Sequence, residues 1–331
     1  MRRLSYGEAI REAFAQLLSQ DPDVFVIGQG VWSPWYVGAS MQGLDAEFGT
    51  ERVIDTPVSE SAVTGMAVGA ALAGKRPIVV HPRMDFMLLA ADPIINEAAN
   101  WSYMSGGRAA VPLVIRGIIN RGGLQAAQHS QALQAFYMHV PGLKVVMPST
   151  PYDAKGLLIA AVMDDNPVMY IDDRWLYDDT GDVPEKPYRV PLGKAAVRRE
   201  GTDITIVASS FMAREATTAA TMLEDERISA EVIDLRSLKP LDIDTIAESV
   251  RKTGRVIVAD GGWRTCGASA EIASVVGEVA FDRLRAPVVR VALPDCPAPM
   301  SAPLEEAYYP RARQIADAVR QAMRAAPSAR I

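Results

Sequence analysis

Cysteine is scarce in this sequence. Its 331 residues include only Cys266 and Cys296, which are far apart and lack the spacing of a metal site. A disulfide-stapled domain and a cysteine-based zinc site are therefore excluded. Because unpaired cysteines are typical of a reducing compartment, we expect a cytoplasmic protein.

An excess of positive charge and long apolar segments are also missing. Lys and Arg number 34 against 40 Asp and Glu, which gives a net charge of −6. We therefore expect no nucleic-acid partner and no binding to an anionic membrane surface. The apolar runs are too short to span a bilayer, and the first six residues do not have the pattern of a signal peptide.

Common motifs of nucleotide-binding and hydrolytic enzymes are absent as well. Gly28-Gln29-Gly30 follows an apolar run but lacks the third glycine of a dinucleotide fingerprint. The sequence contains no P-loop, no Gly-x-Ser-x-Gly elbow and no His-Glu-x-x-His. We therefore do not expect a nucleophile-based hydrolase.

Short apolar runs alternate with helical patterns along the whole chain. This alternation predicts an α/β fold with mostly parallel sheets and helices on both faces. We expect a first domain over residues 1–180, an acidic, proline-rich linker over 181–192 and a second domain over 193–331. The pattern also predicts one long helix over 84–103 and another over 304–323.

The most informative stretch is Asp55-Thr56-Pro57-Val58-Ser59-Glu60. Pro57 forces an extended turn after a buried strand, and Ser59 is a good cap for the helix that follows. Glu60 then stands in the first turn of that helix, at the carboxyl end of a strand, where parallel sheets bind ligands. Alone, Glu60 fits either a solvated acid favoured by the helix dipole or a buried carboxylate that exchanges protons.

Three other loops are expected on the same rim: the Gln29 loop, the turn over 81–86 and the loop that carries His129. The helix behind Glu60, residues 61–74, has almost no bulky side chains. Its glycines cost helix stability unless another backbone approaches closely. That backbone would belong to a second subunit or to a tight crossing within the chain.

Many further stretches match a known family collinearly. They are Asp85-Phe86, 95–99 (INEAA), 103–107 (YMSGG), 112–117 (PLVIRG), 127–131 (AQHSQ), 141–146 (PGLKVV), 148–158 (PSTPYDAKGLL), 190–195 (VPLGKA), 232–236 (VIDLR) and 304–310 (LEEAYYP). With the motif at 55–60, they resemble the beta subunit of the decarboxylating first component of 2-oxo acid dehydrogenase complexes, a group related to transketolases. The resemblance implies a pyrimidine-binding domain followed by a transketolase C-terminal domain.

The resemblance implies thiamine diphosphate as a cofactor shared between an alpha and a beta chain. Glu60 matches the glutamate that contacts the pyrimidine ring nitrogen, where burial would favour a shared proton. Val58 and Phe86 match apolar contacts of the same ring. His129 matches an active-site histidine that handles protons as the acyl group leaves for a lipoyl arm. The residue types alone would equally fit a core aromatic and a structural histidine.

Ions and partners are implied by the same resemblance. Some members hold a potassium ion at positions that match Leu113, Ala161, Val162, Asp164 and Asn166, although these residues also fit a plain helix end. The diphosphate and Mg²⁺ normally sit on the alpha chain, through a Gly-Asp-Gly…Asn motif that this sequence lacks. The implied assembly is a heterotetramer of two alpha and two beta chains, which acts on a small 2-oxo acid and serves a lipoyl acyltransferase.

The sequence departs from the family pattern at four places. Gln29-Gly30 replaces an acidic pair, and residues 32–38 (WSPWYVG) replace a glycine-rich turn. His81-Pro82-Arg83 and residues 172–177 (DDRWLY) also differ. Arg83 would pair either with an acidic group of the substrate or with a residue across an interface.

Three functions are consistent with these observations. The main hypothesis is a 2-oxo acid dehydrogenase beta subunit that passes an acyl group to a lipoyl carrier. The alternative is the beta chain of a two-subunit transketolase-like or acyloin-forming enzyme with an aldehyde acceptor. A non-catalytic assembly subunit is disfavoured, because Glu60, Phe86 and His129 are all present.

Overall fold

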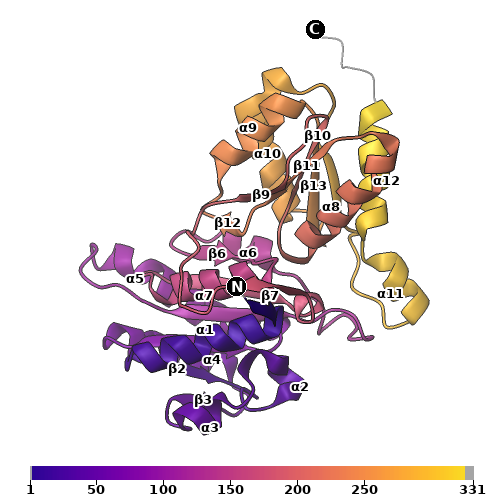
Figure 1. Ribbon diagram of the computed structural model, residues 1–331. Helices are drawn as coiled ribbons and strands as arrows, with labels where there is room; N and C mark the ends of the chain where they lie inside the picture. Colours follow the sequence, from indigo (N-terminus) through magenta and orange to yellow (C-terminus); the bar gives the residue numbers. More distant parts are fainter. Residues whose placement is uncertain (1, 325–331) are drawn as a thin grey trace. The chain divides into compact units, whose positions relative to one another are not determined.

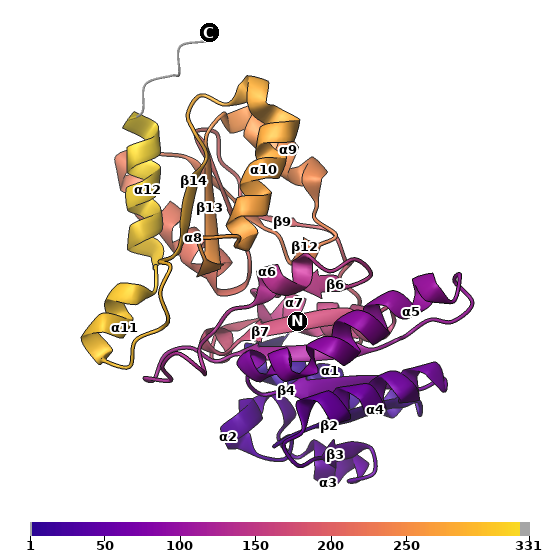
Figure 2. The same ribbon diagram turned by 180° about the vertical axis from the view of Figure 1, so that it is seen from behind.

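The computed structural model describes residues 2–324, which form two units that divide between Leu192 and Gly193 (Figures 1 and 2). Residue 1 and residues 325–331, at the ends of the predicted domains, lie outside this part. The prediction of two α/β units with mostly parallel sheets is confirmed. No helix within residues 2–324 is long and apolar enough to cross a membrane.

The first unit contains eight strands within the described residues. They are β1 (Arg2–Ser5), β2 (Val24–Gly28), β3 (Val53–Asp55), β4 (Arg76–His81), β5 (Val114–Ile119), β6 (Lys144–Val146), β7 (Val168–Asp173) and β8 (Thr180–Val183). Its α-helices are α1 (Tyr6–Gln20), α2 (Pro34–Val37), α3 (Leu44–Phe48), α4 (Glu60–Leu72), α5 (Ala99–Met104), α6 (Gln134–Met138) and α7 (Pro151–Val162). Shorter helical segments are η1 (Gly38–Met41), η2 (Met84–Ala90), η3 (Pro93–Ala98) and η4 (Arg174–Leu176).

The main sheet of this unit is parallel, and its strands run in the order β6-β7-β5-β4-β2-β3. The strands are nearly continuous apolar runs, as expected for a sheet that is covered on both faces. Helix α1 lies against α7, and α4 packs on β4 (Figures 1 and 2). In a separate antiparallel pair, β1 joins β8, so part of the predicted linker is a strand of the first unit.

Helix α4 leaves its small-residue face open. Val63, Ala67 and Ala71 are buried, whereas a side chain added at Gly65 or Gly69 would meet no atom of the described chain within 4 Å. Met66, on the same open face, is 57% exposed. A tight crossing within the chain therefore does not explain these two glycines.

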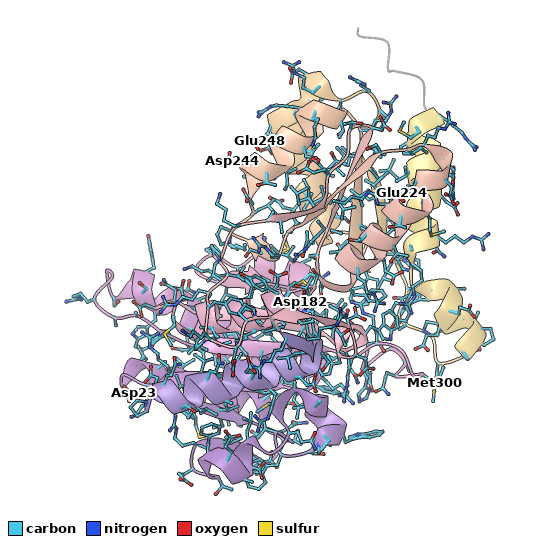
Figure 3. All side chains as sticks on the ribbon, in the orientation of Figure 1. Asp23, Asp182, Glu224, Asp244, Glu248 and Met300 are labelled. Carbon is cyan, nitrogen blue, oxygen red and sulfur yellow. The ribbon has the colours of Figure 1, made fainter. Side chains whose placement is uncertain are left out.

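The second unit contains six strands within the described residues, and five of them form its own sheet. The strands are β9 (Ala196–Arg199), β10 (Ile204–Ala208), β11 (Ala230–Asp234), β12 (Ser237–Lys239), which lies outside this sheet, β13 (Val256–Trp263) and β14 (Val289–Leu293). Its helical segments are α8 (Ser210–Met222), η5 (Glu224–Glu226), α9 (Ile243–Thr253), α10 (Ala268–Ala280), η6 (Phe281–Arg283), α11 (Ala302–Tyr308) and α12 (Ala312–Arg324). The sheet order is β14-β13-β10-β11-β9, and only β9 is antiparallel. Figure 3 labels acidic side chains on α9 (Asp244, Glu248) and η5 (Glu224), all of them exposed.

Two predicted helices are wrong in detail. The predicted helix over 84–103 is η2, η3 and α5 in succession, and η3 has π-helical geometry that begins at Pro93. The predicted helix over 304–323 is split into α11 and α12, with Pro310 between them. Proline lacks the backbone N–H and clashes with the preceding turn, so it interrupts a helix at such points.

A buried ion pair links the centre of the first sheet to its edge loops. Arg116, on β5, donates from Nε and Nη2 to the two carboxylate oxygens of Asp172 on β7, both at 2.9 Å, and both side chains are inaccessible. Nη2 also donates to Ser40 Oγ and Tyr177 Oη. Such a pair stabilises the fold only while both partners are present.

We expect Asp172→Asn to lower the free energy of unfolding by roughly 3–5 kcal/mol, because it leaves a buried guanidinium without its counter-charge. The control is Asp23→Asn, which removes the exposed pair with Lys75 (Asp23 is labelled in Figure 3). That change should cost no more than about 1 kcal/mol. Urea denaturation measures both values, and equal effects of the two substitutions would contradict this account.

Candidate active site

The turn between β3 and α4 is tied by hydrogen bonds to the end of β2 and the loop that follows it. The Thr56 backbone N–H donates to the Gly28 carbonyl at 3.0 Å, and Asp55 Oδ1 accepts from the Val31 backbone N–H at 3.0 Å. Ser59 occupies the cap position of α4, but its side chain makes no capping hydrogen bond, so that part of the prediction is wrong. Glu60 is the first residue of the helix, as the sequence predicted.

The Glu60 side chain is buried at the end of a pocket. It is 8% exposed, and no described residue donates a hydrogen bond to its carboxylate. The pocket is lined by Gly28, Gln29, Thr56, Pro57, Ser59, Glu60, Val63, Val80 and His81. Gly28 is required at this edge, because a Cβ there would lie 2.3 Å from the Val80 carbonyl oxygen. Glu60 is therefore a largely buried residue and not a fully solvated acid, and its exchange of protons stays a prediction.

His81 ties β4 to the Glu60 helix. Its Nε2 lies 3.2 Å from Thr64 Oγ1, one turn after Glu60 on α4. Burial lowers the pKa of His81 to about 4, so the imidazole is neutral at pH 7. A neutral imidazole leaves this pocket without a positive charge opposite Glu60. Its presence on the rim was predicted, but the sequence suggested no role for it.

Phe86 and His129 meet although 43 positions separate them. Their rings are in edge-to-face contact, with centroids 5.3 Å apart and planes at 81°. Phe86 belongs to η2, which follows β4, and His129 belongs to the loop that follows β5. The structure thus joins two of the predicted site residues at neighbouring strand ends. No hydrogen bond or ion pair joins either of them to Glu60 within the described chain.

Asp85 is a buried acid beside this ring pair, to which the sequence assigned no role although Asp85-Phe86 is one of the stretches that match the family. Its Oδ1 accepts from the Gln131 backbone N–H at 3.0 Å, whereas its buried Oδ2 has no partner among the described residues. Burial raises the pKa of Asp85 above its usual value, because the charged carboxylate is less favourable away from water. The feature of the sequence that could have pointed to Asp85 is its position directly before Phe86, just after a strand. Asp85 therefore holds the His129 loop by one oxygen and keeps the other free.

Val58 differs from its neighbours in the motif because its side chain is 71% exposed. An exposed apolar side chain beside a buried carboxylate suits a contact with a ligand or with a second chain. Val58 does not line the pocket that Glu60 lines, so its exposed side chain would meet a partner outside that pocket.

The residues that match a potassium site gather where α7 ends and β7 begins. Leu113 accepts a backbone hydrogen bond from Val168, next to Asn166, and Ala161 accepts one from Asp164. The carbonyl oxygens of Val162 and Asp164 both accept from Arg76 Nη1, at 2.9 and 3.3 Å. In the described residues, no group of three or more His, Cys, Asp and Glu side chains could hold a metal ion.

Two of the departures from the family pattern come together in the fold. Arg174, in the 172–177 stretch, donates to the backbone carbonyls of Pro34, Trp35 and Tyr36 in the 32–38 loop, at 3.0–3.4 Å. Its guanidinium also lies 5.7 Å from the centroid of the Tyr177 ring. These two stretches therefore form one structure on the rim.

The chain matches two protein families in succession. Residues 2–178 match the transketolase pyrimidine-binding domain, and residues 193–315 match the transketolase C-terminal domain. Among solved structures, a split-gene transketolase described as an inactive beta4 tetramer is similar, with a TM-score of 0.78 and 27% identity. That match covers 97% of this chain and 98% of the other.

Curated relatives are similar over nearly their whole length. The beta subunit of acetoin:2,6-dichlorophenolindophenol oxidoreductase from Cupriavidus necator is 44% identical over 334 residues, which cover 98% of each chain. The beta subunit of the pyruvate dehydrogenase E1 component from Rickettsia felis is 45% identical over 321 residues, which cover 96% of this chain and 98% of that one.

The buried His81 should make stability depend on pH. Its pKa is about 4 in the folded protein and near 6.5 when unfolded, so folding favours the neutral ring. The contribution of the neutral His81 ring to the free energy of unfolding is fully present above pH 6.5 and is lost as the pH falls toward 4. In His81→Gln, the loss of unfolding free energy between pH 7 and pH 4 should be smaller than in the wild type, by up to about 3 kcal/mol.

Urea denaturation at several pH values measures this difference. His139→Gln is the matched control, because His139 is exposed and its replacement should keep the wild-type pH dependence. If His81→Gln followed the wild-type curve as well, the assignment of a neutral buried imidazole would be wrong.

Proposed function

This chain belongs to the transketolase-related family of beta subunits of the first component of 2-oxo acid dehydrogenases, and we propose that it acts with an alpha subunit to decarboxylate a 2-oxo acid. The acyl group would pass to a lipoyl carrier. The observation that carries the proposal is the buried Glu60 carboxylate, which has no hydrogen-bond partner in the described chain. The family resemblance found in the sequence is confirmed.

The family implies thiamine diphosphate, and the residues present fit one end of that cofactor. Glu60 offers a carboxyl group without a partner, and Val58 and Phe86 offer apolar contacts for an aromatic ring. When bound, the cofactor supplies the electron sink for the loss of carbon dioxide. In this proposal Val58, Glu60 and Phe86 hold the pyrimidine end, and Glu60 exchanges a proton at its carboxyl group.

His129 is the second proposed catalytic residue. Its ring is fixed by the edge contact with Phe86, and its loop is held by the bond from Gln131 to Asp85. An imidazole in a loop that lies beside the cofactor contact is suited to move a proton while the acyl group is passed on.

We propose that a second chain completes this site and binds Mg²⁺ and the diphosphate. The open face of α4 beside Glu60 suits a contact between subunits, in a heterotetramer of two alpha and two beta chains. A lipoyl acyltransferase and a cytoplasmic location belong to the same proposal.

We also propose a potassium site formed by Leu113, Ala161, Val162, Asp164 and Asn166. Its support is that these residues gather at one place, where α7 ends and β7 begins, and present backbone carbonyl oxygens there.

The alternative, a two-subunit transketolase-like or acyloin-forming enzyme, has less support. The relatives at 44–45% identity are pyruvate and acetoin enzyme subunits, whereas the split-gene transketolase is 27% identical. The dehydrogenase function therefore stands as the conclusion.

Replacing Glu60 tests this function. In the assembly of alpha and beta chains, Glu60→Gln keeps the shape of the side chain but cannot exchange the proton. We expect turnover of the 2-oxo acid to fall by at least about 100-fold, while the mass of the assembly stays unchanged.

Glu51→Gln is the matched control, because Glu51 is an exposed acid of the same unit. It should leave turnover at the wild-type rate. A wild-type rate in Glu60→Gln would show that Glu60 is not catalytic.

A further inference from the structure

Arg83 is a buried cation that has no carboxylate partner. Its side chain lies in the turn between β4 and η2 and is 8% exposed. The other buried arginines of this region differ: Arg116 is paired with Asp172 and Arg121 with Asp173, each at 2.9 Å. No described acidic residue lies within ion-pair distance of Arg83. A buried charge is normally paired, because removing it from water is unfavourable.

The neutral partners of Arg83 leave part of its guanidinium unused. Nη1 donates to the Pro82 carbonyl at 3.0 Å. With the Asn120 amide turned so that its oxygen faces the guanidinium, that oxygen lies 2.9, 3.1 and 3.0 Å from Nε, Nη1 and Nη2. That single oxygen accepts from all three nitrogens, and the Pro82 carbonyl accepts from Nη1 as well. Two neutral oxygens face a guanidinium with five N–H donors, so donor capacity remains for a charged acceptor.

The surroundings of Arg83 do not neutralise its charge. Burial, followed by repulsion from Arg174, lowers the pKa of Arg83. Asp85 acts in the opposite direction, but it makes no ion pair with Arg83, and its own burial favours the uncharged acid. Arg174 donates to backbone carbonyls of the 32–38 loop, which carry no net charge. Two guanidinium groups thus share one region of uncompensated positive charge.

This region adjoins the proposed active site. The Phe86 backbone N–H donates to the Arg83 carbonyl at 3.2 Å, and the Phe86 ring contacts His129. Arg83 and Phe86 therefore share one backbone turn, and the Phe86 ring in turn contacts His129.

We propose that Arg83 binds a carboxylate of the substrate and so selects a 2-oxo acid over a neutral acyloin. This inference rests on the proposed function and makes it more specific, since the relatives include enzyme subunits named for an acid, pyruvate, and for a neutral compound, acetoin. The carboxylate is either the one next to the oxo group or a second one farther along the substrate. Arg83 is then a specificity-determining residue that neutralises the acid in a place shielded from water.

Kinetics of the alpha–beta assembly test this proposal, with 2,6-dichlorophenolindophenol as the electron acceptor. The substrates are pyruvate, 2-oxoglutarate and acetoin, and oxamate serves as an unreactive acid. In Arg83→Gln, kcat/KM for the acids should fall roughly 10- to 100-fold, mainly through KM, and the inhibition constant of oxamate should rise in parallel. The value for acetoin should change less than about twofold, because a neutral substrate forms no charged pair with Arg83.

Further variants keep the test decisive. Arg83→Lys keeps the charge but loses the planar fork, so its KM for acids should lie between those of the wild type and Arg83→Gln, even if Arg83→Gln assembles poorly. Arg108→Gln, at an exposed arginine of the same unit, should match the wild type. If kcat/KM of Arg83→Gln falls only for 2-oxoglutarate, Arg83 binds the second carboxylate of the substrate. If it falls for both acids, Arg83 binds the carboxylate next to the oxo group.

Three results would overturn the proposal. One is unchanged kinetics and oxamate inhibition in Arg83→Gln. Another is turnover of acetoin but of neither acid by the wild type. The third is dissociation of the assembly with an unchanged kcat/KM for the part still assembled, which would pair Arg83 with the partner subunit. The first and third results leave the outcome of Glu60→Gln unchanged and so contradict this inference alone, whereas the second also contradicts the proposed 2-oxo acid substrate.

Discussion

A carboxylate on a largely buried residue, without a hydrogen-bond partner in the described chain, is the constraint that organises the first unit. Such a group favours a bound ligand that brings a hydrogen-bond donor to it. Around Glu60, each neighbouring element is fixed: Gly28 lets β2 lie close to β4, and Thr64 joins α4 to His81. The fold therefore holds one acid in place for a donor that the chain itself does not supply.

The same arrangement fits a site that is shared between two subunits. Val58 and Met66 expose apolar surface on either side of Glu60, and the glycines of α4 face open space. Glycine in an open helix lowers stability and gains nothing within this chain. A second subunit that packs on α4 would cover this surface and bring the rest of the cofactor site to Glu60.

The parts of this account that depend on local pattern could be predicted from the sequence. Alternating apolar runs predicted two α/β units, and Pro57 followed by Ser59 predicted that α4 begins at Glu60. The burial of Glu60 and the contact between Phe86 and His129 depend on tertiary packing between separate strand ends, so periodicity could only place them on one rim. Family resemblance named these residues, but it assigned no role to Asp85 and left two roles open for Arg83. Asp85 lacks a partner for one carboxylate oxygen, and Arg83 lacks a counter-charge. Both facts depend on the surrounding atoms, so only the structure reveals them.

The most direct test of the central claim is a crystal structure of the alpha–beta assembly with thiamine diphosphate bound. The account predicts that a carboxyl oxygen of Glu60 lies about 2.6–3.2 Å from a ring nitrogen of the pyrimidine, a distance over which a proton can be shared. A pyrimidine ring bound elsewhere, or a Glu60 side chain turned toward solvent in that assembly, would contradict it.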